Sequence, residues 1–540
     1  MAIAAGTSFL APARAQSVNF GPVSSDLGVP VFTGWDQVWC DASRGPAGTV
    51  FTWSSNQDVF LRFYDLAFAP RTGDLFANST LNLDVQDEPA VAWSQANNVL
   101  VAWSERHGYD GEQMGIFARR YDMNGVPSGA EFQVNVSGAA SQWRPLVAPR
   151  VGGGWLVAWS GDWDGDSFFR IFDEAGAPLS GDVRINVFEF DAQVDPAIAQ
   201  ASDGTIFTAF VDFASHDNIG AGLNLWGRTF SANGTPLQAF EFPLLPFANG
   251  DQREPRVAVD GLDRFVLVYQ DDAGDGSGNA ILCRRFTSAG VPLALPFRVN
   301  TTTASDQVEA RVVAFEDGGF VVTWMDFSQG QPRVRGQRFD TNAAPLGDEF
   351  GVNENVGSCW HHNLAANARG TELIAAYDSI EASSGLSDVY RRRFKTSATP
   401  VAYGEAKVNS QGCLPSISGA GTPTPSGTAP FTITATNVLN NKYGFVVYGH
   451  ESSFTPYRGG TWLVGQPFRR GGNFDTGGNP PPNDCSGVIQ YDFNARIRSG
   501  VDPELVPGRT ISVQFIYRDV PDPTGYGLGL TDALRFTIAP

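Results

Sequence analysis

The chain has 540 residues, of which 37 are basic and 57 acidic, giving a formal charge of −20, and 42% are hydrophobic. This length predicts two or more domains with large cores, and the negative charge argues against nucleic acid or an anionic membrane as a partner. No apolar stretch is long enough to span a bilayer. The 60 glycines and 13 tryptophans are typical of a turn-rich all-β protein.

Residues 1–15, MAIAAGTSFLAPARA, have the apolar run and the Ala-Arg-Ala end of a secretory signal. The basic start of such a signal is missing, so the alternatives are a true start further upstream or an Ala-rich tail. We expect export, which predicts a secreted or cell-surface protein.

A repeat of about 50 residues organises the chain from residue 36 to residue 410. An aromatic residue that ends a hydrophobic run recurs at intervals from 50 residues (Trp53 to Trp103) to 59 residues (Phe210 to Tyr269). Turns such as NGVP (124–127) follow the third run of most units, and a Val-Asn or Ile-Asn pair closes most of them. Three landmarks in one register indicate a true internal repeat.

Each unit contains four short runs rich in Val, Ile, Phe and Trp, separated by Gly, Pro, Asn or Asp. These runs predict four antiparallel strands, which is the period of a β-propeller blade. The seven units therefore predict an all-β chain with a seven-bladed β-propeller at 36–410. Six blades plus a divergent N-terminal strand pair is the alternative, because the first unit is the weakest copy.

Four of the five cysteines form two candidate pairs. Cys413 and Cys485 are the only cysteines in the C-terminal region, and we expect a disulfide between them. Cys40 begins the first unit and Cys359 the last, so a Cys40–Cys359 disulfide would join the first blade to the seventh. Closing so long a loop constrains the unfolded chain by roughly 4–5 kcal/mol in the chain-entropy account. The alternative is two free core thiols; an oxidising compartment favours the bond.

The composition changes after Asn409. Residues 414–430, LPSISGAGTPTPSGTAP, are rich in Pro, Ser, Thr and Gly and mark a domain boundary. Strand-like runs such as FTITATNVL, VIQYDFNARI and TISVQFIYRD then predict a β-sandwich module at 411–540.

Three motifs of this region are PPPNDCSG (480–487), DFNARIRSGVDPELVPG (492–508) and GLTDALRFTI (529–538). They resemble a C-terminal module that recurs, after propeller-type repeats, on secreted proteins of several bacterial groups. The repeat units, with W-S, R-F, G-x-P and V-N signatures, resemble the broad class of bacterial secreted β-propeller repeat proteins. The first resemblance implies no known activity, and the second implies architecture alone.

Propellers bind ligands where the loops leading into the innermost strands converge. If the Pro-x-Val-Ala strand is innermost, two rings of side chains surround this mouth. One ring is mostly glutamine: Asp36, Gln86, Gln142, Gln193, Gln252, Gln307 and Trp360. The other differs between units: Val38, Glu88, Arg144, Asp195, Glu254, Glu309 and His362.

A side chain repeated in every unit is typical of a scaffold contact, whereas varied side chains are expected where several copies share one asymmetric site. The alternative for the varied ring is that it too is scaffold. We predict a ligand-binding site made of Glu88, Arg144, Asp195, Glu254, Glu309, Trp360 and His362.

The loop GDWDGDSF places Asp162, Asp164 and Asp166 at alternate positions, with Gly165 to turn the chain. Oxygen ligands at this spacing suit Ca²⁺, which is the only ion predicted; no cofactor is required. The late glutamate of an EF-hand loop is missing. The favoured alternative is an acidic hairpin that binds nothing.

Sialidase Asp-boxes, G-x-S-x-G, H-E-x-x-H, P-loop and C-x-x-C motifs are absent. The leading hypothesis is a secreted propeller that binds a glycan or another cell-surface component. One alternative is a carbohydrate-active hydrolase or lyase with its site at the channel mouth, using the same carboxylates with Arg144 and His362. The other is a structural surface protein whose rings are purely scaffold.

Overall fold

The computed structural model describes residues 20–31, 34–79, 85–106, 114–136, 141–161, 165–188, 191–213, 222–246, 250–272, 274–353, 358–380, 385–396, 400–507, 509–520, 522 and 524–539. The chain divides into two compact units, one formed by Phe20–Thr396 and the other by the chain from residue 397 onward. Both are nearly all-β. Within the described ranges, no helix has the length and apolar character needed to cross a membrane.

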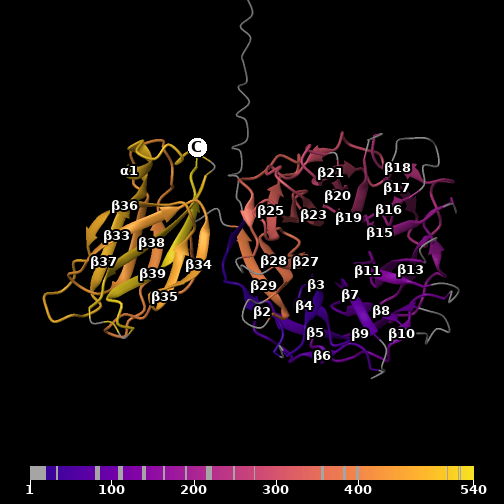
Figure 1. Ribbon diagram of the computed structural model, residues 1–540, viewed down its shortest axis with the longest axis horizontal. Helices are drawn as coiled ribbons and strands as arrows, with labels where there is room; N and C mark the ends of the chain where they lie inside the picture. Colours follow the sequence, from indigo (N-terminus) through magenta and orange to yellow (C-terminus); the bar gives the residue numbers. More distant parts are fainter. Residues whose placement is uncertain are drawn as a thin grey trace, which may run out of the picture. The chain divides into compact units, whose positions relative to one another are not determined.

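In the described part of the first unit, six four-stranded antiparallel sheets and one five-stranded sheet surround a common centre (Figure 1). The innermost strands are β3 (Gln37–Arg44), β7 (Val85–Trp93), β11 (Trp143–Pro149), β15 (Gln193–Gln200), β19 (Gln252–Val259), β23 (Gln307–Ala314) and β27 (Cys359–Ala366). Each innermost strand packs against the next, and β27 packs against β3, which closes the circle. The arrangement is β-propeller-like.

The second strands of the sheets are β4 (Gly48–Ser55), β8 (Val99–Arg106), β12 (Trp155–Ser160), β16 (Ile206–Asp212), β20 (Phe265–Asp271), β24 (Phe320–Asp326) and β28 (Glu372–Ile380). The third strands are β5 (Asp58–Asp65), β9 (Met114–Tyr121), β13 (Ser167–Phe172), β17 (Asn224–Phe230), β21 (Ala280–Phe286), β25 (Arg333–Phe339) and β29 (Ser387–Thr396). The second strands are buried on both faces, because each sheet is covered by its two neighbours. The aromatic landmarks of the repeat lie here; Trp53, Trp103 and Trp324 are at most 1% exposed.

Short outer strands complete six sheets: β6 (Leu75–Phe76), β10 (Phe132–Gln133), β14 (Val183–Arg184), β18 (Phe242–Pro243), β22 (Phe297–Arg298) and β26 (Phe350–Gly351). The seventh sheet instead takes its outer strands, β1 (Phe20–Pro22) and β2 (Leu27–Gly28), from the N-terminal segment, and both pair with β29. Residues 401–410, which we expected to end the seventh repeat, lie in the second unit, where β30 (Val401–Tyr403) pairs with β39 (Leu528–Thr537).

Buried asparagine–glutamine pairs join the outer strands of four sheets to the sheet that follows. Asn135 Oδ1 accepts the backbone N–H of Ile116 at 2.9 Å, while its Nδ2 donates to Gln142 Oε1 at 2.9 Å. The same pair recurs as Asn78–Gln86, Asn186–Gln193 and Asn300–Gln307. The V-N landmark and the glutamine ring are therefore two halves of one scaffold contact.

The fourth sheet lacks this contact. Leu245 stands where five other sheets have asparagine, since the backbone N–H of Leu244 donates to Leu225 as that of Val134 donates to Ile116. Gln252, which should receive the bond, keeps a buried Oε1 with no hydrogen-bond partner among the described residues.

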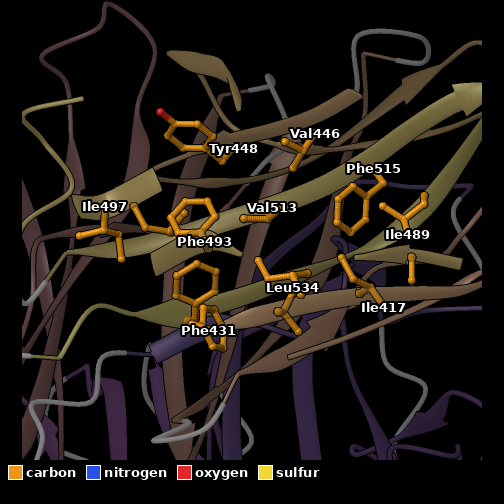
Figure 2. Packing of buried hydrophobic residues seen from close by; sticks show 14 of the residues in the cluster. Ile417, Phe431, Val446, Tyr448, Ile489, Phe493, Ile497, Val513, Phe515 and Leu534 are labelled. Atoms are coloured by element: carbon orange, nitrogen blue, oxygen red, sulfur yellow. The ribbon is translucent and has the colours of Figure 1, made fainter. Parts of the chain in front are cut away.

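The second unit contains a five-stranded sheet, β30-β39-β38-β33-β36, a three-stranded sheet, β31-β32-β37, and a β34–β35 hairpin. The remaining bounds are β31 (Ser416–Ala420), β32 (Thr432–Val438), β33 (Tyr443–Gly449), β34 (Ser452–Tyr457), β35 (Gly460–Val464), β36 (Phe468–Asp475), β37 (Gly487–Asp492), α1 (Phe493–Arg498) and β38 (Thr510–Arg518). Side chains from both larger sheets share one core, with Ile417 and Ile489 facing Val513 and Leu534 (Figure 2).

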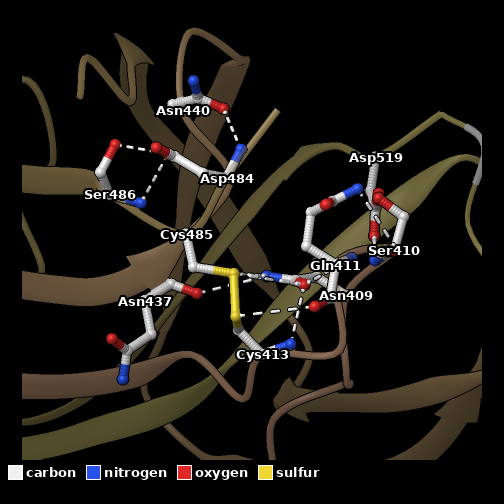
Figure 3. The surroundings of a disulfide bond; sticks show 10 residues. All are labelled: Asn409, Ser410, Gln411, Cys413, Asn437, Asn440, Asp484, Cys485, Ser486 and Asp519. Atoms are coloured by element: carbon white, nitrogen blue, oxygen red, sulfur yellow. Dashed lines mark hydrogen bonds between the residues drawn. A yellow bond between two sulfur atoms is a disulfide. The ribbon is translucent and has the colours of Figure 1, made fainter. Parts of the chain in front are cut away.

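A disulfide joins Cys413 to Cys485, as expected, with Cα atoms 6.4 Å apart. Asn409 organises its surroundings: Oδ1 accepts the backbone N–H of Cys413 at 3.0 Å, and Nδ2 donates to the backbone oxygen of Asn437 at 3.2 Å (Figure 3). We expected Asn409 to close the last repeat. It instead positions the disulfide loop of the second unit.

Candidate functional site

Each innermost strand carries a β-bulge near its start. In the second sheet Asp87 pairs with Ser104 and Ala90 with Ala102, which leaves Glu88 and Pro89 unpaired between them. The first bulge residue is left-handed in six sheets, with φ from 51° to 56°: Trp39, Glu88, Arg144, Asp195, Glu254 and Glu309. Such φ values are uncommon outside glycine and carry a strain cost. The bulge is thus a property of the repeat, while the side chain on it differs between sheets.

These bulge residues, with His361 in the seventh sheet, define what we call the inner ring: Trp39, Glu88, Arg144, Asp195, Glu254, Glu309 and His361. His361 is the seventh member by analogy with Glu88. Glu88 bonds to Ser104, the residue after the aromatic landmark Trp103. His361 bonds in the same way to Asp378, the residue after the landmark Tyr377. The ring lies at one end of the circle of innermost strands.

Two members of this ring differ by one residue from our expectation of Val38 and His362. The reason is the length of the inner hairpins. Ala90 faces Ala102, twelve residues later, whereas Asp41 faces Thr52 after eleven and Asn363 faces Ala376 after thirteen. A fixed offset from the aromatic landmark therefore fails in the first and last sheets.

Arg144 joins two neighbouring carboxylates of the inner ring. Its Nη1 is 3.0 Å from Asp195 Oδ1, and its Nε is 3.6 Å from Glu88 Oε1. The backbone N–H of Arg144 and the hydroxyl of Ser104 both donate to Glu88 Oε2. Burial opposes the charge of Arg144, but Asp195 and Glu88 raise its pKa above the ordinary value. Three predicted site residues thus form one contact group.

Glu254 and Glu309 are less compensated. Glu254 Oε2 is buried and has no hydrogen-bond partner among the described residues. Glu309 Oε2 is 3.8 Å from Arg311 Nη2. Burial, followed by the charge of Glu254, raises the pKa of Glu309 despite the opposing charge of Arg311. A carboxyl held toward its neutral form beside a second carboxylate can act as a general acid.

A buried carboxylate holds the imidazole of His361. Its Nδ1 lies 2.7 Å from Asp378 Oδ2, and the Asp378 side chain is 0% exposed. Asp378 Oδ1 accepts the backbone N–H groups of Trp360 and His361 at 3.0 and 2.8 Å. Burial alone lowers the pKa of His361, but the hydrogen bond and charge of Asp378 and the charge of Glu309 raise it above the ordinary value. With Nδ1 donating to Asp378, Nε2 is the atom left to exchange a proton.

An aromatic ring packs against this imidazole. The Trp39 ring packs against His361 with centroids 4.0 Å apart. Trp360, the residue just before His361, is 48% exposed. An aromatic face beside carboxylates offers a sugar both apolar contact and hydrogen-bond acceptors.

His362 lies outside the inner ring. It is 1% exposed, and its Nε2 is 3.0 Å from Thr323 Oγ1 of the sixth sheet. Burial lowers its pKa well below the ordinary value, so the ring stays neutral near pH 7. His361 supplies the imidazole instead. Alternation along the strand signals the difference, because adjacent residues point to opposite faces.

Cys40 and Cys359 are buried free thiols, and the predicted bond between them is not formed. Both sulfurs lie 3.9 Å from one acceptor, the backbone oxygen of His361. Each thiol thus has a hydrogen-bond acceptor, and burial raises the pKa of both well above the ordinary value. They lie at the junction of the first and seventh sheets as neutral thiols.

Asp162 and Asp164 lie outside the described residues. Asp166 is engaged in the scaffold, since Oδ1 accepts Asn186 Nδ2 at 2.6 Å and Oδ2 lies 3.2 Å from Arg184 Nη1. No group of three or more metal-ligating side chains occurs in the part of the chain that the structure describes. The Ca²⁺ site stays a prediction.

No family model and no curated protein matches this chain. Solved structures are similar to it at low identity. An ulvan lyase, a polysaccharide lyase, has a TM-score of 0.47 at 9% identity, over 69% of this chain and 95% of that chain. A protein of unknown function from Dyadobacter fermentans scores 0.45 at 8%, covering 71% and 100%. An α-L-arabinanase from Penicillium chrysogenum scores 0.39 at 13%, covering 56% and 92%. At such low scores these likenesses carry no argument about ligand or reaction.

Proposed function

We propose that this protein is a secreted seven-bladed β-propeller that binds a glycan at the inner ring, followed by a C-terminal β-sandwich module. One observation carries the proposal. The asparagine–glutamine scaffold contact recurs with the same two side chains at four sheet junctions, whereas the bulge residue is Trp, Glu, Arg, Asp or His in different sheets. Residues that only hold the scaffold together are expected to be the same in each sheet. Residues that share one asymmetric ligand are expected to differ between sheets.

The chemistry of the ring is that of sugar recognition. Glu254 offers a buried acceptor oxygen without a partner among the described residues, which a sugar hydroxyl would fill. Trp39 packs its ring against His361, and Trp360 presents an exposed aromatic side chain on the same strand as His361. The Cys413–Cys485 disulfide is consistent with export into an oxidising compartment.

Binding of the full-length protein to a broad glycan array tests this proposal. We expect a small set of related glycans to bind, and Trp360→Ala and Glu254→Gln to weaken their binding about tenfold or more, near 1.4 kcal/mol. The control is Trp462→Ala in the second unit. No glycan binding by a folded wild-type protein refutes the proposal.

A second candidate is a carbohydrate-active hydrolase or lyase with its site in the same ring. The observation that favours it is the His361–Asp378 pair next to Glu309, a carboxyl held toward its neutral form. An imidazole oriented by a buried carboxylate can take or give a proton at Nε2, while Glu309 protonates a leaving oxygen and Glu254 acts as a base or nucleophile.

Turnover of the array glycans separates the two candidates. New reducing ends without an ultraviolet-absorbing product indicate a hydrolase, whereas new reducing ends together with an ultraviolet-absorbing unsaturated product indicate a lyase. We expect Glu309→Gln or His361→Gln to abolish either activity while leaving folding intact. A glycan that binds but is never cleaved eliminates the enzyme.

A further inference from the structure

Two arginines follow the inner ring by two residues. Arg256 pairs with Val268 in the fifth sheet, and Arg311 pairs with Thr323 at the equivalent position in the sixth. The equivalent residues of the other sheets are Asp41, Ala90, Leu146, Ala197 and Asn363. Polar or charged residues thus occupy four consecutive sheets, from the fifth round to the first, and Ala or Leu occupies the other three. At this position of the innermost strands, one side of the circle is therefore polar or charged and the other side is apolar.

Most hydrogen-bond donors of these two guanidinium groups are unused within the described residues. Arg256 Nη1 donates to the backbone oxygen of Pro255 at 2.7 Å, and Arg311 Nη1 to that of Ala310 at 3.0 Å. Both acceptors belong to the arginine's own strand. Because a guanidinium has five N–H donors and the Arg311 side chain keeps 15% of its surface exposed, donors of this pair remain for a ligand.

The two cations are also poorly neutralised. Burial lowers the pKa of Arg256 to about 10, and the nearby charge of Arg311 lowers it as well, against Glu254 and Asp195. Among the described residues, Arg256 has no carboxylate within ion-pair distance, and Arg311 has Glu309 at 3.8 Å. An anion placed at both guanidinium groups would relieve their mutual repulsion.

The acidic members of the inner ring do not fill this role. Glu88 and Asp195 are already engaged by Arg144, and Glu309 approaches Arg311 only to 3.8 Å. Glu254 needs a donor, not a cation alone, because its buried oxygen has no hydrogen bond within the described ranges. A ligand with an anionic group and hydroxyls on one ring would satisfy the arginines and Glu254 together.

We propose that Arg256 and Arg311 form an anion subsite, so that the glycan bound at the inner ring is an acidic polysaccharide bearing carboxylate or sulfate groups. This inference rests on the proposed glycan binding. Guanidinium groups match the planar carboxylate and the sulfate oxygens with paired hydrogen bonds. Hydroxyls of the same residue donate to Glu254.

The subsite is first tested with simple anions. The unfolding temperature of the full-length protein is measured in sodium sulfate or sodium acetate, with sodium chloride holding ionic strength constant. We expect both anions to stabilise wild type more than Arg256→Gln or Arg311→Gln. General salt effects cancel in this comparison. The control is Arg298→Gln, on the outer strand of the fifth sheet, which should respond as wild type does.

The second test uses oligosaccharides in isothermal titration calorimetry. The probes are oligogalacturonate for carboxylate, a sulfated dextran oligomer for sulfate, and dextran oligomers and methyl-esterified oligogalacturonate as neutral forms. We expect one acidic probe to bind at least about tenfold more tightly than its neutral form, and each Gln variant to lose most of that preference. Should a Gln variant fail to fold, Arg256→Lys keeps the charge but loses the paired geometry, and should lose affinity for the acidic probe.

The outcomes separate the two proposals. Equal effects of the simple anions on wild type and folded Gln variants overturn the subsite, whatever the glycans do. Neutral and acidic probes that bind equally in wild type and variants also overturn the subsite but leave glycan binding standing. Anion stabilisation that depends on both arginines, with no oligosaccharide bound, supports the subsite and counts against glycan binding.

Discussion

The imidazole Nδ1 of His361 and the carboxylate Oδ2 of Asp378 lie 2.7 Å apart, with the carboxylate fully buried beneath the inner ring. Asp378→Asn removes the charge that holds the pKa of His361 above its ordinary value. We therefore expect the His361 pKa to fall in this variant, measured by NMR titration of the ring carbons with His361→Gln for assignment. Glu504→Gln, which alters the partner of His450, should leave His361 unchanged. An unaltered His361 pKa in Asp378→Asn contradicts the pairing.

The His361–Asp378 pair also determines the direction in which stability changes with pH. A pKa raised by folding contributes stability that is present below the unfolded pKa of about 6.5 and is lost as pH rises through the folded value. The stability difference between wild type and Asp378→Asn should therefore shrink at alkaline pH. Urea unfolding at a series of pH values measures it.

Glu372 holds the junction between the first and seventh sheets. Its two oxygens each lie 2.5 Å from a guanidinium, one from Arg44 and one from Arg393, and the Glu372 side chain is 9% exposed. Glu372→Gln leaves two arginines close together without their shared anion, so we expect a loss of about 3–5 kcal/mol in the free energy of unfolding. Glu504→Gln, at a 47% exposed ion pair, should cost less than about 1 kcal/mol. Equal losses of unfolding free energy in the two variants would contradict a stabilising role of Glu372 at this junction.

The incomplete scaffold contact of the fourth sheet gives a matched comparison. Gln307 accepts a hydrogen bond from Asn300 at 2.9 Å, whereas Gln252 has an Oε1 with no partner within the described residues, and both are 0% exposed. We expect Gln307→Leu to destabilise the protein by about 1–3 kcal/mol more than Gln252→Leu, since only the former breaks an asparagine–glutamine hydrogen bond. Chemical denaturation of both variants decides the point, and a larger loss at Gln252 would contradict it.

Lys407 and Asp522 form a buried ion pair in the second unit, 3.0 Å apart and at most 3% exposed. The ammonium also donates to Thr524 Oγ1 and to the backbone oxygens of Arg458 and Leu528. Lys407→Met leaves the carboxylate without its counter-ion and should cost about 3–5 kcal/mol. Adding Asp522→Asn should recover part of this loss, because no uncompensated charge then remains. A double variant no better than the single one would argue against the ion pair.

The pH dependence of this pair runs opposite to that of His361. Although burial opposes the charged form, hydrogen bonds from Thr524 and Lys407 hold the pKa of Asp522 well below its ordinary value. Its contribution is present above the unfolded pKa of about 3.9 and is lost as pH falls through the lower folded value. The difference between wild type and the double variant should therefore be flat near neutral pH and shrink in strong acid.

The repeat and its strand order could be predicted because each unit buries an aromatic side chain at the same place and most units have a similar turn after the third strand. The repeated glutamines were also predictable as scaffold residues, because the same side chain recurs in most units. The identity of the inner ring was predictable in five sheets. It failed by one residue at Trp39 and His361, because hairpin length varies and a one-residue shift turns the neighbouring side chain toward the other face.

Other features left little trace in the sequence. Asp378 sits inside the buried run AAYDSI, where nothing but its pairing with His361 distinguishes it from a strand residue. Strands of two or three residues, FGP and LG, carry no periodicity, so the outer strands of the seventh sheet could not be found by pattern. The grouping of Arg256 and Arg311 with the other polar residues on one side of the circle becomes visible only when the seven sheets are aligned position by position.

The strands β1 and β2 are synthesised before every other part of the circle, yet their partner β29 is synthesised after all the rest of it. The backbone N–H and C=O groups of β1 and β2 that pair with β29 therefore have no partner strand until β29 has been synthesised. A chain cut between residue 28 and β3 would keep its first six sheets but leave β29 with a bare edge. Such an edge accepts any extended strand, including the same segment of a second copy. Losing a few N-terminal residues would then convert closure within one molecule into exchange between molecules.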